Sequence, residues 1–95
     1  MEKSISAVGF TLTEANNEQI EKKLKRVAYA EDMIKTLTMH VKYTKNFTFE
    51  TTVNFKWGAQ AHVSSEDADF GVALNKTVDL LDSKITKEKE KAQEK

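Results

Sequence analysis

The chain has 95 residues and a mass of 10.8 kDa, and its 15 lysines and arginines balance its 15 aspartates and glutamates. A chain of this size buries only about 60–65% of the surface of its unfolded form, which predicts one domain over residues 1–95 and no deep substrate cavity. Hydrophobic residues make up 39%, which excludes intrinsic disorder, and the absence of cysteine excludes disulfides and thiolate chemistry.

The first third of the chain predicts a strand followed by a helix. Residues 4–12 are short, β-branched and apolar, as in a strand. Thr13 offers a hydroxyl cap, and Ile20, Leu24 and Val27 then recur at spacings of four and three. This spacing predicts a helix from Glu14 to about Ala30.

The middle of the chain predicts three consecutive antiparallel strands. Apolar and polar residues alternate over residues 37–44, 47–57 and 59–64, with tight turns near residues 45–46 and at Gly58. Phe47, Phe49 and Phe55 share the parity of Val53, so they are expected in the core rather than as stacking platforms for bases. The even positions, which include two histidines, should face outward.

The last third returns to helical spacing. Ser65 is expected to cap a helix whose first turn holds three acids and whose apolar stripe runs from Phe70 to Ile85. Residues 86–95 have no apolar partner, so about this stretch is expected to be a charged C-terminal extension that frays or lies on another surface.

The order of elements is therefore β-α-β-β-β-α. A sheet with one apolar face and two amphipathic helices is expected to pack as a two-layer α+β fold, with a four-stranded sheet and both helices on one face. The opposite face should stay open to water or to a partner.

Several passages together resemble the short ribosome hibernation-promoting factors, a family that includes the ribosome-associated inhibitor A proteins. The passages are TLTEA, EKKLKRV, HVKYTK, GAQAHVSSEDAD and ALNKTVDLLDSKITKEKEK, and the resemblance covers essentially the whole chain. It implies a fold similar to double-stranded-RNA-binding domains. It also implies binding to the small ribosomal subunit, through its 16S-type rRNA, where messenger RNA and transfer RNA would sit. Translation would thereby be inhibited in stressed or resting cells.

The resemblance also implies which basic residues contact ribosomal RNA. Carried over by position, these are Lys23, Arg26, Lys42, Lys45, Lys87, Lys89 and Lys91. The basic pattern of this chain adds neighbouring positions, so the candidates for rRNA binding are Lys22, Lys23, Arg26, Lys42, Lys45, Lys56, Lys84, Lys87, Lys89 and Lys91. The chain departs from the family at Leu80 and Ser83, where basic residues are usual, and Lys76 and Lys84 are placed to compensate.

The distribution of charge along the strands supports the same reading. Between Lys35 and His62 the only acid is Glu50, which predicts a cationic open face of the sheet with acidic margins. The basic run of the first helix has a simpler explanation as a solvated face, because Glu18–Lys22 and Glu21–Lys25 form i,i+4 pairs.

Nothing in the sequence indicates an enzyme, a metal site or a cofactor. The two histidines lack a third ligand, and no serine stands beside a base. The sequence shows neither a signal peptide nor a membrane-spanning run. We therefore expect a cytoplasmic protein without catalytic residues, small-molecule substrate or membrane contact, monomeric off the ribosome. The alternative is a protein-interaction module or a general double-stranded-RNA-binding module on the same fold. Charge reversal at Lys42 and Lys45 distinguishes these functions.

Overall fold

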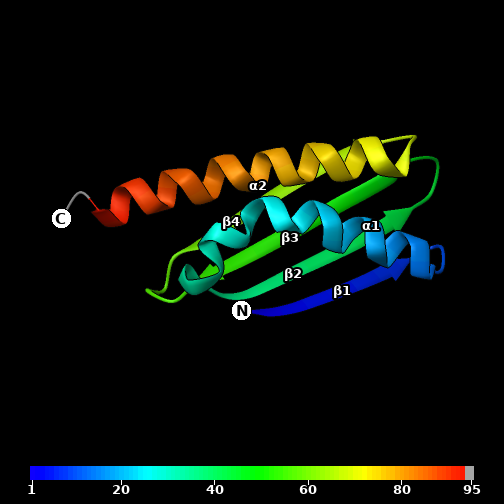
Figure 1. The fold of residues 1–95 in the computed structure, drawn as a ribbon. Coiled ribbons are helices and arrows are strands. Elements are labelled where there is room, and N and C mark those ends of the chain that lie inside the picture. The colour runs from blue at the N-terminus through cyan, green and yellow to red at the C-terminus, as the bar shows by residue number, and fades with distance from the viewer. Residues whose placement is uncertain (94–95) are drawn as a thin grey trace.

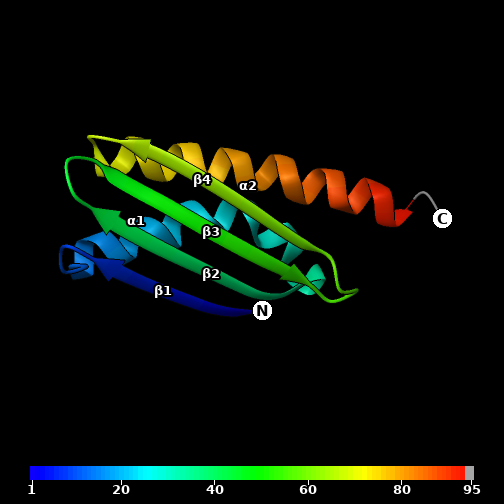
Figure 2. The same cartoon turned by 180° about the vertical axis from the view of Figure 1, so that it is seen from behind.

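The computed structural model describes residues 1–93, which form one mixed sheet and a layer of helices. The elements are β1 (Glu2–Val8), α1 (Glu14–Leu24), the 3-10 helix η1 (Lys25–Met33), β2 (Ile34–Tyr43), β3 (Phe47–Phe55), β4 (Gln60–Asp67) and α2 (Phe70–Gln93). The sheet order is β1-β2-β3-β4, with β1 parallel to β2 and the other pairs antiparallel. Both helices cover one face (Figure 1), and the other face is open (Figure 2). The predicted β-α-β-β-β-α fold is confirmed.

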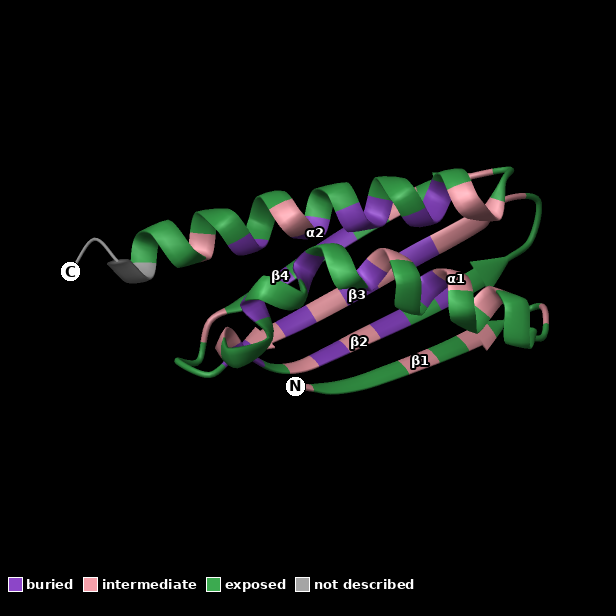
Figure 3. Ribbon diagram, in the orientation of Figure 1, coloured by how far each residue is buried: buried purple, intermediate pink, exposed green. Residues whose placement is uncertain are grey.

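The core lies between the sheet and the helices, as the alternation of the strands predicts. Met39 and Val41 on β2 are fully buried, and so are Phe49 and Val53 on β3. Phe55 is 2% exposed, and Figure 3 shows buried positions alternating along these strands. The prediction that the strand phenylalanines belong to the core is confirmed for Phe49 and Phe55, whereas Phe47 is half-buried against the same cluster.

The two helices lie side by side and run in the same direction. Gln19 on α1 lies beside Gly71 at the start of α2, and Arg26 contacts Asp79 farther along. A β-carbon at position 71 would stand 2.9 Å from the Gln19 Nε2 atom, so alanine there would require the end of this flexible side chain to move. Glycine in a helix costs about 1 kcal/mol relative to alanine.

The first helix differs from the prediction after Leu24. The chain continues as 3-10 helix over residues 25–33 instead of as α-helix to Ala30. The buried residues there, Val27 and Ala30, are three apart, and half-buried Met33 follows at the same interval. Because a 3-10 helix has three residues per turn, Val27, Ala30 and Met33 lie on one side of it and all face the core. In an α-helix, which has about 3.6 residues per turn, residues spaced by three would shift progressively around the helix axis.

The start of α2 also differs from the prediction. Ser65 is not a cap but a residue of β4, paired with Phe49, and its hydroxyl donates a hydrogen bond to the Ala73 carbonyl at 2.8 Å. The helix is capped instead by Asp69, whose carboxylate accepts from the Val72 amide at 3.0 Å. The acids expected in the first turn therefore lie before the helix, because β4 stays paired with β3 as far as Asp67.

Helix α2 continues well beyond Ile85, its last fully buried residue, to Gln93. In Figure 1 its C-terminal turns project past the end of the sheet. This projection coincides with the extension that the sequence predicts. Residues 94 and 95, which belong to that prediction, lie outside the described residues.

Substitution of two glycines by alanine should have unequal effects on stability. Gly9 and Gly58 both have a positive φ, of 86° and 93°. A β-carbon at Gly9 would lie 2.2 Å from the Tyr43 carbonyl oxygen, whereas at Gly58 it would meet nothing within 4 Å. G58A should lower the free energy of unfolding by about 1–2 kcal/mol, and G9A by about 3 kcal/mol or more. Urea denaturation measures both, and equal losses would contradict the proposed clash.

Asp67 should make stability depend on pH in the acid range. The backbone N–H of Asp69 and then the ammonium of Lys76, at 2.9 and 3.1 Å, lower the pKa of its carboxyl group. The ionised carboxylate therefore stabilises the fold above the ordinary carboxyl pKa, and this contribution is lost as pH falls through the lower folded pKa. The stability difference between wild type and D67N should be present at neutral pH and diminish as pH falls below the ordinary range of carboxyl pKa values. A difference that is unchanged from pH 7 to pH 2 would contradict this account.

Candidate nucleic-acid interface

The basic residues of the first helix lie on different sides of it. Lys22 is exposed on the outer side, in a shallow groove that Glu14, Glu18 and Lys25 also line. Lys23 is half-buried and follows Gln19 by one turn, so it lies on the side that faces α2. The helix therefore separates these two candidates instead of presenting them together.

Arg26 stands at the centre of a polar cluster that joins the two helices. One of its nitrogens, Nη1, is 2.6 Å from the Asp79 carboxylate, and Nη2 is 4.0 Å from that of Asp82. The Tyr29 hydroxyl donates a hydrogen bond to Asp82, and the ammonium of Lys89 lies 5.9 Å from the centroid of the Tyr29 ring. Two candidates far apart in sequence, Arg26 and Lys89, are thus brought to the same cluster between η1 and α2.

Tyr29 is a member of this cluster that the sequence analysis did not single out. Partial burial and then the hydrogen bond to Asp82 raise the pKa of its hydroxyl group, so it stays protonated and continues to donate. The ring is 50% exposed. A signal was present in the sequence, since Tyr29 follows Arg26 by one turn on the same side.

The last turns of α2 carry four candidates, and three of them share one side of the helix. Lys84, Lys87 and Lys91 are spaced by three and four residues, which aligns them on one exposed stripe with Leu80, while Lys89 points toward η1. The ion pair found on this stripe, within the described part of the helix, joins Lys91 to Glu88 at 3.7 Å. The stripe is therefore cationic along the projecting part of the helix.

The open face of the sheet is not the cationic surface that the sequence predicts. Lys42 is paired with Glu50, with 3.4 Å between Nζ and Oε1. The register also brings Glu2 from β1 and Glu66 from β4 onto this face. The prediction is wrong because it considered only the middle of the chain, whereas the outer strands supply acids from outside that window.

Lys45 and Lys56 lie at opposite ends of β3. Lys45 is in the turn before this strand and Lys56 in the turn after it, so they are separated by about 25–30 Å along the sheet. The turn between β3 and β4 is at the same end as the projecting turns of α2, whereas the turn between β2 and β3 is at the end where that helix begins (Figure 1). These two lysines and Lys42 therefore do not form one patch.

Both histidines are exposed on the open face, as predicted. The His40 Nδ1 atom is 2.6 Å from the Ser6 hydroxyl, and the His62 Nδ1 atom is 3.0 Å from the Thr52 hydroxyl. Within residues 1–93, no three histidines or acids come close enough together to hold a metal ion. The histidines thus belong to a polar network of hydroxyl groups on the open face.

The comparison with family profiles decides the identity of the fold. Residues 4–93 match the family described as sigma 54 modulation protein / S30EA ribosomal protein. The chain belongs to this family. Its members are ribosome-associated proteins of the hibernation-factor type, in agreement with the resemblance stated from the sequence.

Two solved structures share the fold. A ribosomal subunit interface protein from Coxiella burnetii superposes with a TM-score of 0.85 at 20% identity, covering 94% of this chain and 98% of that one. The N-terminal domain of Protein Y from Thermus thermophilus gives 0.79 at 24% identity, covering 92% and 98%. The search of curated proteins found no match. Among the described helices, none has the length and apolar character needed to cross a membrane.

The ion pair between Arg26 and Asp79 should contribute little to stability. Their side chains are 47% and 64% exposed, and exposed pairs are typically worth less than about 1 kcal/mol. A double-mutant cycle of R26M and D79N, measured by urea denaturation, should give a coupling energy of about 0.5–1 kcal/mol that falls as salt is added. A coupling above about 2 kcal/mol would show that the pair is an essential clamp and not available to a ligand.

Proposed function

We propose that this protein binds the small ribosomal subunit and inhibits translation by occupying the channel for messenger RNA and transfer RNA. Membership of a ribosome-associated family supports ribosome binding and is the observation that carries the proposal. The basic candidates named above would contact phosphates of ribosomal RNA. Such contacts position a protein on RNA by shape and charge and need little reading of sequence.

The helix layer is the stronger candidate for these contacts. It holds the lysine stripe of α2, formed by Lys84, Lys87 and Lys91, and the cluster around Tyr29 with Arg26 and Lys89. Because the stripe lies on the projecting part of α2, it can enter a narrow RNA-lined channel ahead of the sheet. Lys42 is less available, because Glu50 already neutralises part of its charge.

Arg26 can exchange its partner at low cost. Its ion pairs with Asp79 and Asp82 are exposed, so a phosphate group can replace a carboxylate with a small change in free energy. A guanidinium group binds phosphate in a bidentate geometry, which favours this exchange.

Binding should depend steeply on salt, since each phosphate contact releases counterions. We expect the protein to sediment with small ribosomal subunits at low salt and to be released as salt rises. K87Q/K91Q should weaken association about tenfold and reduce the dependence on salt, and K42Q/K45Q should weaken it less. The control K3Q/K25Q removes the same charge from two lysines that are not among the candidates, and should bind like wild type.

Three results would overturn the proposal. Association that is indifferent to salt would contradict phosphate contacts. Equal binding to empty subunits and to subunits loaded with messenger RNA and transfer RNA would contradict occupancy of the channel. If all three double variants bound and inhibited translation like wild type, the protein-interaction alternative, which the 43% exposure of Leu80 favours, would replace it.

A further inference from the structure

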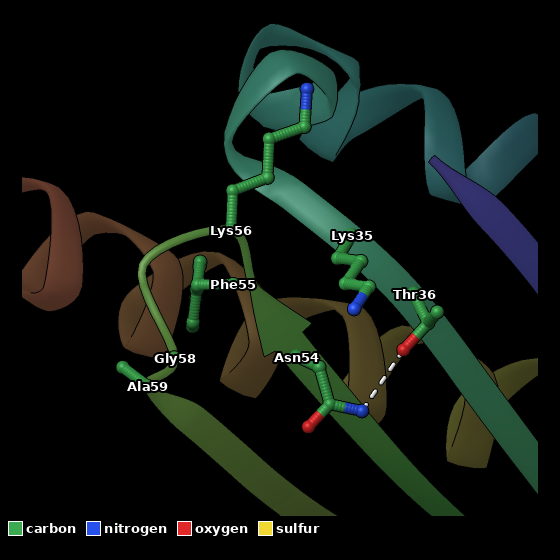
Figure 4. Close-up of a pocket in the computed structure, with 7 residues that line it drawn as sticks. All are labelled: Lys35, Thr36, Asn54, Phe55, Lys56, Gly58 and Ala59. Atoms are coloured by element: carbon green, nitrogen blue, oxygen red, sulfur yellow. Dashed lines mark hydrogen bonds between the residues drawn. The ribbon is translucent and has the colours of Figure 1, made fainter.

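A pocket lies at the end of the sheet that holds the turn between β3 and β4, and it is not part of the clusters described above. It lies where β2 begins and β3 ends, has a volume of about 410 Å³, and is lined by residues that include Lys35, Thr36, Asn54, Lys56 and Gly58 (Figure 4). Lys35 is not one of the basic candidates predicted from the sequence. It occurs at an irregularity in the pairing of β2 and β3 between Ile34 and Thr36, which breaks the alternation of faces.

The pocket carries positive charge that the described residues do not neutralise. Two of its lining side chains are lysines and none is an acid. Within residues 1–93, Lys35 and Lys56 take part in none of the ion pairs, unlike Lys3, Lys42 and Lys76. In Figure 4 the Lys35 side chain runs toward Thr36 and Asn54, whereas that of Lys56 points away toward η1. The Lys35 ammonium group is therefore directed at the pocket, and Lys56 adds positive charge at its edge, so that both favour binding of an anion.

A chain of side-chain hydrogen bonds supplies a neutral donor at the same place. The Gln60 amide donates to the Asn54 carbonyl oxygen at 3.0 Å, and the Asn54 amide donates to the Thr36 hydroxyl at 2.9 Å. Each donor holds the next in place, and each bond strengthens its neighbour. The Thr36 oxygen is an acceptor in this chain, so its own proton is left to donate, and the described residues give it no acceptor. A hydroxyl proton and the ammonium group of Lys35 suit the oxygens of a phosphate group.

An exposed aromatic ring stands beside the pocket in the same turn. Trp57 is 45% exposed and stacks on Phe55, with 5.0 Å between ring centroids and 17° between ring planes. Phe55 is almost fully buried, so it holds the indole against a fixed support. The turn is open, since a β-carbon at Gly58 would meet nothing within 4 Å. A base can therefore stack on Trp57 while its phosphate occupies the pocket.

We propose that this pocket and Trp57 form a binding site for single-stranded RNA, with one phosphate held by Lys35 and the Thr36 hydroxyl and one neighbouring base on Trp57. Duplex RNA fits less well, because its bases are already stacked on one another and do not reach a side chain. The inference rests on the proposed function only in taking RNA as the ligand class. It adds a site on the hairpin end of the sheet, distinct from the helix layer.

The test is a titration of the full chain with a short single-stranded oligoribonucleotide. Trp57 is the one tryptophan of the chain, so quenching of its fluorescence reports the stacked base directly. K35Q/K56Q should weaken binding about tenfold, and T36V, which keeps the charge, about threefold. W57L, followed by anisotropy of a labelled oligoribonucleotide, should weaken binding at least about fivefold. The control K3Q/K25Q should stay within about twofold of wild type, since these lysines lie outside the pocket.

Competitors separate this site from other anion sites. Unlabelled single strand should displace the probe, whereas inorganic phosphate, the matching duplex and a short acidic peptide should displace it poorly. Absence of quenching, unchanged binding by K35Q/K56Q, or equal displacement by any of these competitors would overturn the proposal. Failure of the proposed function is seen separately, as loss of sedimentation of wild-type protein with small subunits, and leaves the oligoribonucleotide result standing.

Discussion

The structure depends on burial of one face of the sheet under two parallel helices. Strands β2 and β3 direct their apolar residues to this side, and α1, η1 and α2 fill it from above. With a chain this small, the single layer of contacts is the whole core, and its loss would unfold the protein. All residues that are free to bind a partner must therefore lie on the outer side of the helices, on the open face, or at the two ends of the sheet.

Much of this architecture could be predicted from the sequence, because the strands and the α2 stripe have clear periods. The details that failed depend on neighbours that a local pattern does not contain. Ser65 has the composition of a helix cap, but its pairing with Phe49 keeps it in β4. The change to 3-10 helix after Leu24 follows from the three-residue spacing of Val27 and Ala30 against the core. Both errors lie at element boundaries, where tertiary contacts decide between similar local choices.

The basic residues show a sharper limit of sequence reasoning. The sequence shows how many basic residues there are and in which order they occur. Which of them lie close together depends on the register of the sheet and on the orientation of the helices. Glu2 and Glu66 reach the open face only through β1 and β4, and Arg26 and Lys89 belong to one cluster only because η1 packs beside α2. Lys35 lines the same pocket as Lys56 at a point where the pairing of β2 and β3 is irregular. The roles of the basic candidates in binding RNA remain predictions.

The projection of α2 beyond Ile85 has a thermodynamic consequence of its own. Residues 86–91 have no core beneath them, and a helical segment this short is unstable in water unless a longer helix extends into it. Neighbouring lysines and glutamates give it only weak local support. A polyanion that neutralises the charges of Lys87 and Lys91 would remove the repulsion between them and stabilise these helical turns. The affinity for such a ligand is therefore coupled to the helicity of residues 86–91. A substitution of an exposed residue in this segment that changes only its helix propensity changes the affinity, even though the residue does not contact the ligand.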